Sequence, residues 1–162
     1  MTNKVNGELE SVEILTKLVA IYKAALEAAK RKQAVLGSGT IADLKETLRT
    51  EETLAESIRK LERERLALQE HYGWPGSIRQ LVALLPEEHQ SRAAELADEL
   101  SGTVRALALQ NSINSEIITH LQNFISNNLD LIHNMQSGPA YNPGGEVSPL
   151  PAGGRSIVDR KI

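Results

Sequence analysis

The sequence predicts an all-α protein: an elongated antiparallel helical bundle or coiled coil of three long helices and one short helix, with a disordered Pro/Gly-rich C-terminal tail. Apolar residues recur every three or four positions through most of the chain, which is the period of one helix face. Aromatic residues make up only 3% of the 162 residues, so Leu, Ile, Val and Ala must build the core, as in interlocking helices. Proline and glycine gather at a few breaks and near the C-terminal end, where helices should stop.

The first helix is expected from about Glu8 to Leu36. It carries one apolar stripe at helical spacing, and Gly37-Ser38-Gly39 should end it. The stripe comprises Val12, Leu15, Val19, Tyr22, Leu26 and Ala29.

The second helix should begin at Thr40, because Asp43 follows three residues later in the pattern of a capping box. Its period slips between Leu48 and Leu54, where we expect local overwinding or a slight break. The stripe comprises Ile41, Leu44, Leu48, Leu54, Ile58, Leu61 and Leu68. Gly73-Trp74-Pro75-Gly76 is the strongest breaker inside the chain.

A short apolar helix, Ser77 to Leu85, should precede the longest one. Pro86 and the two glutamates after it suit the first turn of the last helix. The apolar repeat of that helix, from Ala93 to Met135, would be about 65 Å long at about 1.5 Å per residue. The Pro/Gly-rich residues after it cannot build a core. We therefore expect one helical-bundle domain over residues 1–136 and a flexible tail over residues 137–162.

The last helix has a wider apolar face beyond Ile113 than one bundle seam needs. At 100° per residue its apolar side chains span roughly 160°, whereas a surface helix needs about 100°. They are Ile113, Ile117, Ile118, Leu121, Phe124, Ile125, Leu129, Leu131 and Ile132. Either several bundle neighbours cover the whole arc, or part of it receives an amphipathic helix from a partner. Three asparagines lie at or inside the arc: Asn111, Asn114 and Asn128. Their side-chain amides either fix the register between packed helices or remain partly hydrated.

Composition argues against several classes of function. The net charge of -3 offers no broad basic field for nucleic acid. The absence of cysteine excludes disulfides, thiolate zinc sites and cysteine nucleophiles, and fits a reducing cytoplasm. No signal peptide or membrane-spanning stretch is expected. The four histidines have no metal-ligand spacing and no catalytic motif is present, so we expect no enzyme activity, no cofactor and no metal.

Five features occur in a fixed order along nearly the full chain. The first two are Leu15-x-x-Leu18-Val19, continued by Ala24-Ala25-Leu26-Glu27, and Leu54-x-x-x-Ile58-x-x-Leu61-Glu62-x-x-Arg65. The others are the break at Gly73, Leu107-x-x-x-Asn111-x-x-Asn114, and the tail motif Tyr141-Asn142-Pro143-Gly144-Gly145. Their order and spacing resemble the FlgN family of bacterial flagellar type III export chaperones.

That resemblance implies a non-catalytic cytoplasmic chaperone. It would bind the C-terminal helical region of hook-associated (hook-filament junction) proteins, prevent their premature assembly and deliver them to the export gate. The implied client-binding residues are Ile117, Ile118, Leu121, Phe124, Ile125, Leu129 and Ile132. Tyr141 would dock to the cytosolic domain of the gate. The alternative is a structural coiled-coil protein, an obligate dimer in which a second copy fills the arc.

Overall fold

A computed structural model describes residues 2–73 and 76–136 of the chain. It contains helices α1 (Thr2–Ser38), α2 (Ile41–Tyr72), α3 (Ile78–Leu84) and α4 (Glu87–Gln136), and these residues include no strand. The predicted fold class, three long helices and one short one, is confirmed. The chain divides into two compact units, residues 1–119 and 120–162. The predicted flexible tail, residues 137–162, lies outside the described residues, so the division after residue 136 stays a prediction.

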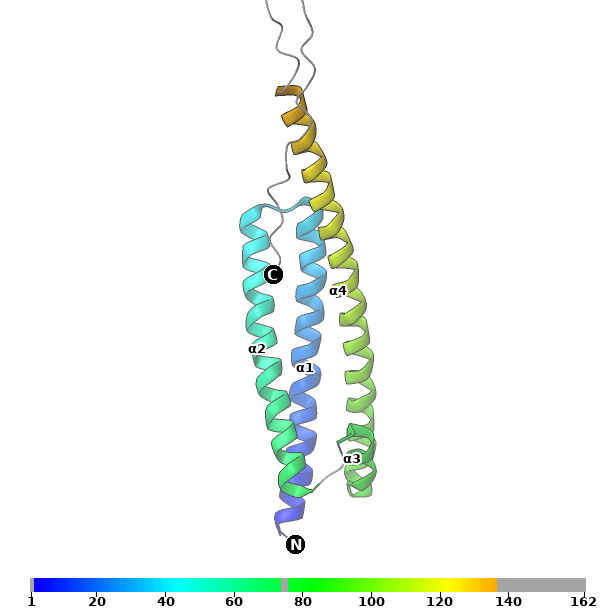
Figure 1. The fold of residues 1–162 in the computed structure, drawn as a ribbon. Helices are drawn as coiled ribbons and strands as arrows, with labels where there is room; N and C mark the ends of the chain where they lie inside the picture. The colour runs from blue at the N-terminus through cyan, green and yellow to red at the C-terminus, as the bar shows by residue number, and fades with distance from the viewer. Residues whose placement is uncertain (1, 74–75, 137–162) are drawn as a thin grey trace, which may run out of the picture. The chain divides into compact units, whose positions relative to one another are not determined.

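In the first unit, α1 and α2 form an antiparallel hairpin, and the part of α4 up to residue 119 also runs along α1 (Figure 1). The core lies where these helices meet near α3. Its buried side chains are Leu15, Leu18, Val19, Leu85, Ala93, Leu96 and Leu100. Partly buried residues from α2 and α3, Leu61, Ile78 and Val82, pack against them. Burial of this aliphatic cluster is the main stabilising contribution in the first unit.

Helix α1 starts at Thr2, before the predicted start at Glu8. The predicted stripe is confirmed in its inner positions, since Leu15, Val19 and Ala29 are buried. Gly7 is also buried, and a Cβ atom at this position would lie 2.6 Å from Cζ of Tyr72. Glycine therefore allows the Tyr72 ring to approach α1 closely, and a Cβ atom at this position would displace the ring.

Helix α2 begins with the predicted capping box. The Thr40 amide donates to Asp43 Oδ2 at 2.9 Å, and the Asp43 amide donates to Thr40 Oγ1 at 3.2 Å. The helix then continues unbroken to Tyr72, so the break expected between Leu48 and Leu54 is absent. Thr47 is buried whereas Leu48 is 47% exposed, so the inner face of α2 follows Thr47 and the predicted stripe is wrong at Leu48. Ile41 is exposed as well.

The connection from α2 to α4 also agrees with the sequence. Gly73 closes α2 in the left-handed region with φ 65°, which suits glycine. The short helix is confirmed, and α4 begins directly after Pro86 with two glutamates in its first turn. In the first part of α4, Leu96 is buried and Val104 is 39% exposed.

Candidate functional site

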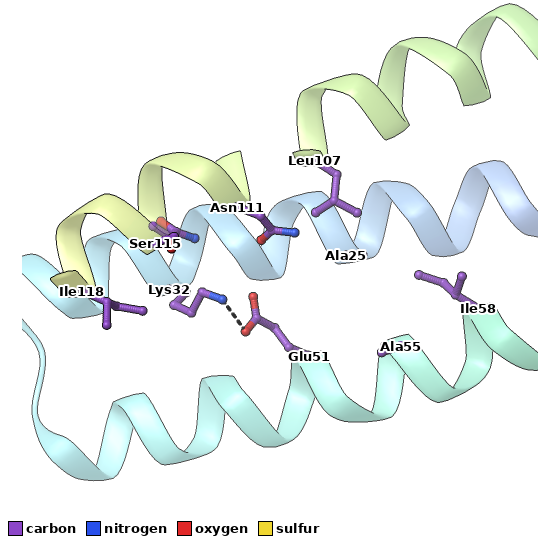
Figure 2. Close-up of a pocket in the computed structure, with 10 residues that line it drawn as sticks. Ala25, Lys32, Glu51, Ala55, Ile58, Leu107, Asn111, Ser115 and Ile118 are labelled. Atoms are coloured by element: carbon purple, nitrogen blue, oxygen red, sulfur yellow. Dashed lines mark hydrogen bonds and ion pairs between the residues drawn. The ribbon is translucent and has the colours of Figure 1, made fainter. Parts of the chain in front are cut away.

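Two of the predicted client-binding residues lie in the first unit. Ile117 and Ile118 are half-buried near the end of that unit. Ile118 lines a cavity of about 390 Å³ to which α1, α2 and α4 all contribute (Figure 2). Bundle neighbours therefore cover only part of the wide apolar face at this level, whereas one of the two interpretations of the sequence had them cover the whole arc.

Each of the three helices contributes apolar side chains to this cavity, beside polar and charged ones. Ala25 comes from α1, Ala55 and Ile58 come from α2, and Leu107 lies with Ile118 on α4 (Figure 2). Apolar walls with a few polar groups are typical of a binding pocket.

One ion pair crosses the same cavity. Nζ of Lys32 on α1 lies 2.8 Å from Oε2 of Glu51 on α2, with side chains 14% and 21% exposed. A pair shielded to this extent is screened less by salt than a surface pair. Sequence reasoning missed it, because neither residue belongs to a motif and the two lie on different helices.

Asn114 is a buried amide that joins α4 to α1. Its Nδ2 donates to the Ala29 carbonyl at 2.8 Å, and its Oδ1 accepts from Gln110 Nε2 at 3.3 Å. Gln110 Nε2 also donates to Gln33 Oε1 at 2.8 Å. The sequence left two roles open for this asparagine, and these bonds favour the one in which it fixes the register of α4 on α1. The amide has hydrogen-bond partners within the protein and is only 1% exposed, so it is not hydrated. Asn111 is exposed and lines the cavity.

The other predicted client-binding residues lie in the second unit, whose described residues, 120–136, are wholly helical. Every described side chain there is exposed. The exposed fractions are 39% for Leu121, 67% for Phe124, 56% for Ile125, 61% for Leu129 and 51% for Ile132. With Leu131 and Met135, which are 62% and 75% exposed, these residues form what we call the exposed arc. At 100° per residue it covers roughly 160° of the helix surface.

The remainder of this helical segment is almost free of charge. Between residues 120 and 136, Asp130 is the only Asp, Glu, Lys or Arg, and the other polar residues are Asn, Gln, Ser and His. Asn128 lies inside the arc but donates from Nδ2 to the Phe124 carbonyl at 2.8 Å. Its amide therefore already has an acceptor within the helix. A surface of this kind attracts partners through apolar burial rather than through ion pairs.

Tyr141, the predicted gate-docking residue, lies outside the described residues. Within residues 2–73 and 76–136, no three His, Asp or Glu side chains are grouped so that they could hold a metal ion. In the same part of the chain no helix has the length and apolarity that a membrane span requires.

Comparison with known proteins identifies the chain. A family model described as FlgN protein matches residues 10–149, which include most of α1 and all of α2, α3 and α4. Neither a curated protein nor a solved structure matches the chain. FlgN is a chaperone family rather than an enzyme family, and the matched region covers most of the sequence. The chain therefore belongs to the FlgN family of flagellar export chaperones.

Proposed function

We propose that this chaperone binds the C-terminal helical region of hook-associated junction proteins in the cytoplasm, prevents their premature assembly and delivers them to the type III export gate. The observation that carries the proposal is the exposed arc, in which Phe124 and Leu129 expose more than half of their surface. Contiguous apolar surface that no neighbour covers marks an interaction site. An amphipathic helix from a client would cover it in the helix-in-groove mode.

The energetics of the arc suit a client that is disordered before it binds. Full burial of one Leu, Ile or Phe side chain stabilises a complex by roughly 1.5–3 kcal/mol. Several such side chains are needed, because ordering a disordered segment costs about 2–5 kcal/mol of the gross interaction energy. The arc offers seven apolar side chains in one helical segment. The proposal keeps Ile117 and Ile118 in the client-binding set, as the sequence predicted.

The decisive experiment is calorimetric titration of the full chain with a peptide from the C-terminal helix of a junction protein. We expect one peptide to bind per chain and Ile125→Asp or Leu121→Asp to abolish binding, because each places a carboxylate within an apolar interface. Circular dichroism should show nearly unchanged helicity, since both side chains are exposed.

The matched control is Asn123→Asp, which adds the same charge to the same helical segment but outside the arc. Binding by Asn123→Asp should equal that of the wild type. Equal losses in Ile125→Asp and Asn123→Asp would contradict the proposal, as would absence of binding to any junction peptide. A dimer that stays intact at nanomolar concentration and ignores these peptides would favour the structural coiled coil instead.

Delivery to the gate is assigned to Tyr141. Tyr141→Ala should weaken binding to the cytosolic domain of the export gate and leave the affinity for the junction peptide unchanged. Both affinities can be measured by calorimetry on the same preparation. An effect of Tyr141→Ala on the junction peptide would refute this division between the helix and the tail.

A further inference from the structure

A second cavity in the first unit differs from the one at Ile118 in its charge. It has a volume of about 540 Å³ and lies among α1, α2, α3 and α4. Tyr22, Ile78, Leu100 and Val104 provide apolar surface in it. It does not include any residue of the proposed client-binding set.

Three arginines line this cavity, and only one of them is neutralised. Arg65 pairs with Glu62, from Nε to Oε2, at 2.7 Å. Arg105 donates from Nη2 to the neutral Ser101 hydroxyl at 2.9 Å. Among the described side chains, neither Arg79 nor Arg105 has an ion pair with a carboxylate. Both are exposed at the cavity.

The resulting positive charge is a local departure from the rest of the chain. The cavity lining carries Arg65, Arg79 and Arg105 against Glu62, whereas the whole chain has a net charge of -3. A third cavity, between α1 and α2 at the same end of the hairpin, has the opposite sign, since Glu10, Glu13, Glu64 and Lys17 line it. Guanidinium groups beside an apolar floor are the arrangement that favours carboxylates on an apolar peptide.

Tyr22 adds a neutral polar group to this floor. Burial, together with the nearby Glu62 carboxylate, raises the pKa of Tyr22 above its usual range. Its hydroxyl therefore stays protonated and can donate a hydrogen bond to an anionic group.

We propose that this cavity, with Arg79 and Arg105 at its mouth, is a docking site for an acidic amphipathic segment of a partner protein, separate from the client surface. Apolar side chains of that segment would cover Ile78 and Val104, and its carboxylates would pair with the two arginines. The chain's own residues 137–162 are a poor complement, because Arg155, Arg160 and Lys161 outnumber Glu146 and Asp159 there.

The test uses a synthetic helical peptide of repeated Leu-Glu-Glu-Leu-Leu-Glu-Glu heptads, titrated into the full chain by calorimetry. We expect binding that weakens as salt rises, and about tenfold weaker binding to the double variant Arg79→Glu, Arg105→Glu, because two rim charges change sign. The double variant Arg79→Gln, Arg105→Gln should give an intermediate affinity. Circular dichroism should confirm that both fold, since the two side chains are exposed.

Two controls define the specificity of the effect. A peptide with Lys in place of every Glu should lose no affinity in either double variant, because any binding of it to the exposed arc does not involve Arg79 or Arg105. Arg49→Glu introduces the same kind of charge reversal at an exposed position of α2 and should leave the affinity unchanged. An equal loss of affinity for the Lys peptide in the double variants, or an equal loss in Arg49→Glu, would overturn the proposal. Conversion of a dimer to a monomer by Arg79→Glu, Arg105→Glu would also overturn it, because the occupant would then be a second copy.

Discussion

Two stretches of α4 have the same apolar period but opposite surroundings. Between Ala93 and Asn114 the inward side chains are buried, and Leu96 is 1% exposed. Between Leu121 and Met135 every side chain is exposed, and Phe124 is 67% exposed. The comparison shows that an apolar stripe predicts a helix whose apolar face must be buried. Whether the chain itself or a partner buries that face depends on which other helices lie beside it. The first stretch is covered by its own chain, and we propose that a client covers the second.

The strongest test of this comparison removes a large aliphatic side chain from each stretch. Leu96→Ala should lower the free energy of unfolding by about 2–5 kcal/mol, because it leaves a cavity in the core. Leu129→Ala, at an exposed position, should change it by no more than about 0.5 kcal/mol. Urea unfolding followed by circular dichroism measures both. A similar loss in the two variants would show that the exposed arc is part of the folded core.

The two asparagines of α4 give a smaller contrast. Asn114→Ala removes a buried amide that bonds to α1 and should cost about 1–3 kcal/mol of unfolding free energy. Asn128→Ala removes an exposed amide that bonds only to the Phe124 carbonyl among the described atoms, so its effect should be within about 0.5 kcal/mol. The same urea experiment distinguishes them. Equal effects would mean that the Asn114 bonds do not fix the packing of α4 on α1.

An exposed residue can still contribute to the free energy of unfolding, and substitutions at the start of α2 can test this. Thr40 is exposed but caps the helix, so Thr40→Ala should cost about 1 kcal/mol of unfolding free energy. Thr50→Ala is the matched control, since Thr50 is exposed within the same helix and, among the described atoms, its side chain bonds only to the Glu46 carbonyl. A loss in Thr50→Ala as large as that in Thr40→Ala would argue against the capping role.

The smallest expected effect is the pH dependence of the same cap. Hydrogen bonds from the Thr40 amide and then from its side chain lower the pKa of Asp43 below its ordinary value of 3.8. Because the folded-state pKa is depressed, the stabilisation is present above the ordinary value and is lost as pH falls through the folded pKa. Asp43→Asn should therefore flatten the decline in unfolding free energy between about pH 5 and pH 2. An unchanged decline would assign the acid sensitivity to other carboxylates.

Local features of the fold were predictable because the residues that determine them are adjacent in sequence. The Thr40 cap and the breaks at Gly73 and Pro86 each depend on a few neighbouring residues. Whether Thr47 or Leu48 faces the core depends on where a partner helix lies. Periodicity places such neighbours on adjoining parts of the surface and cannot decide which one is buried.

The candidate site was predictable to a similar degree. The width of the arc indicated that one seam could not cover it, but the sequence left open whether other bundle helices would. The structure covers Ile118 in part and leaves Phe124 exposed. The Lys32–Glu51 pair and the cavity at Arg79 and Arg105 were not predicted. Both arise from residues far apart in the chain, and single-helix patterns carry no information about such pairs.

The close approach of Tyr72 to Gly7 restricts how this protein can change in length. That contact and the Lys32–Glu51 pair join α1 and α2 at two separate levels. A one-residue insertion between the levels in either helix would rotate the residues beyond it by about 100° and break one of the two contacts. Paired insertions of seven residues, one in each helix at the same level, keep both contacts nearly in phase, because seven residues make almost two full turns. The hairpin can therefore lengthen or shorten only when α1 and α2 change together by the same number of residues. Its length in turn sets how much of α4 can pack along it.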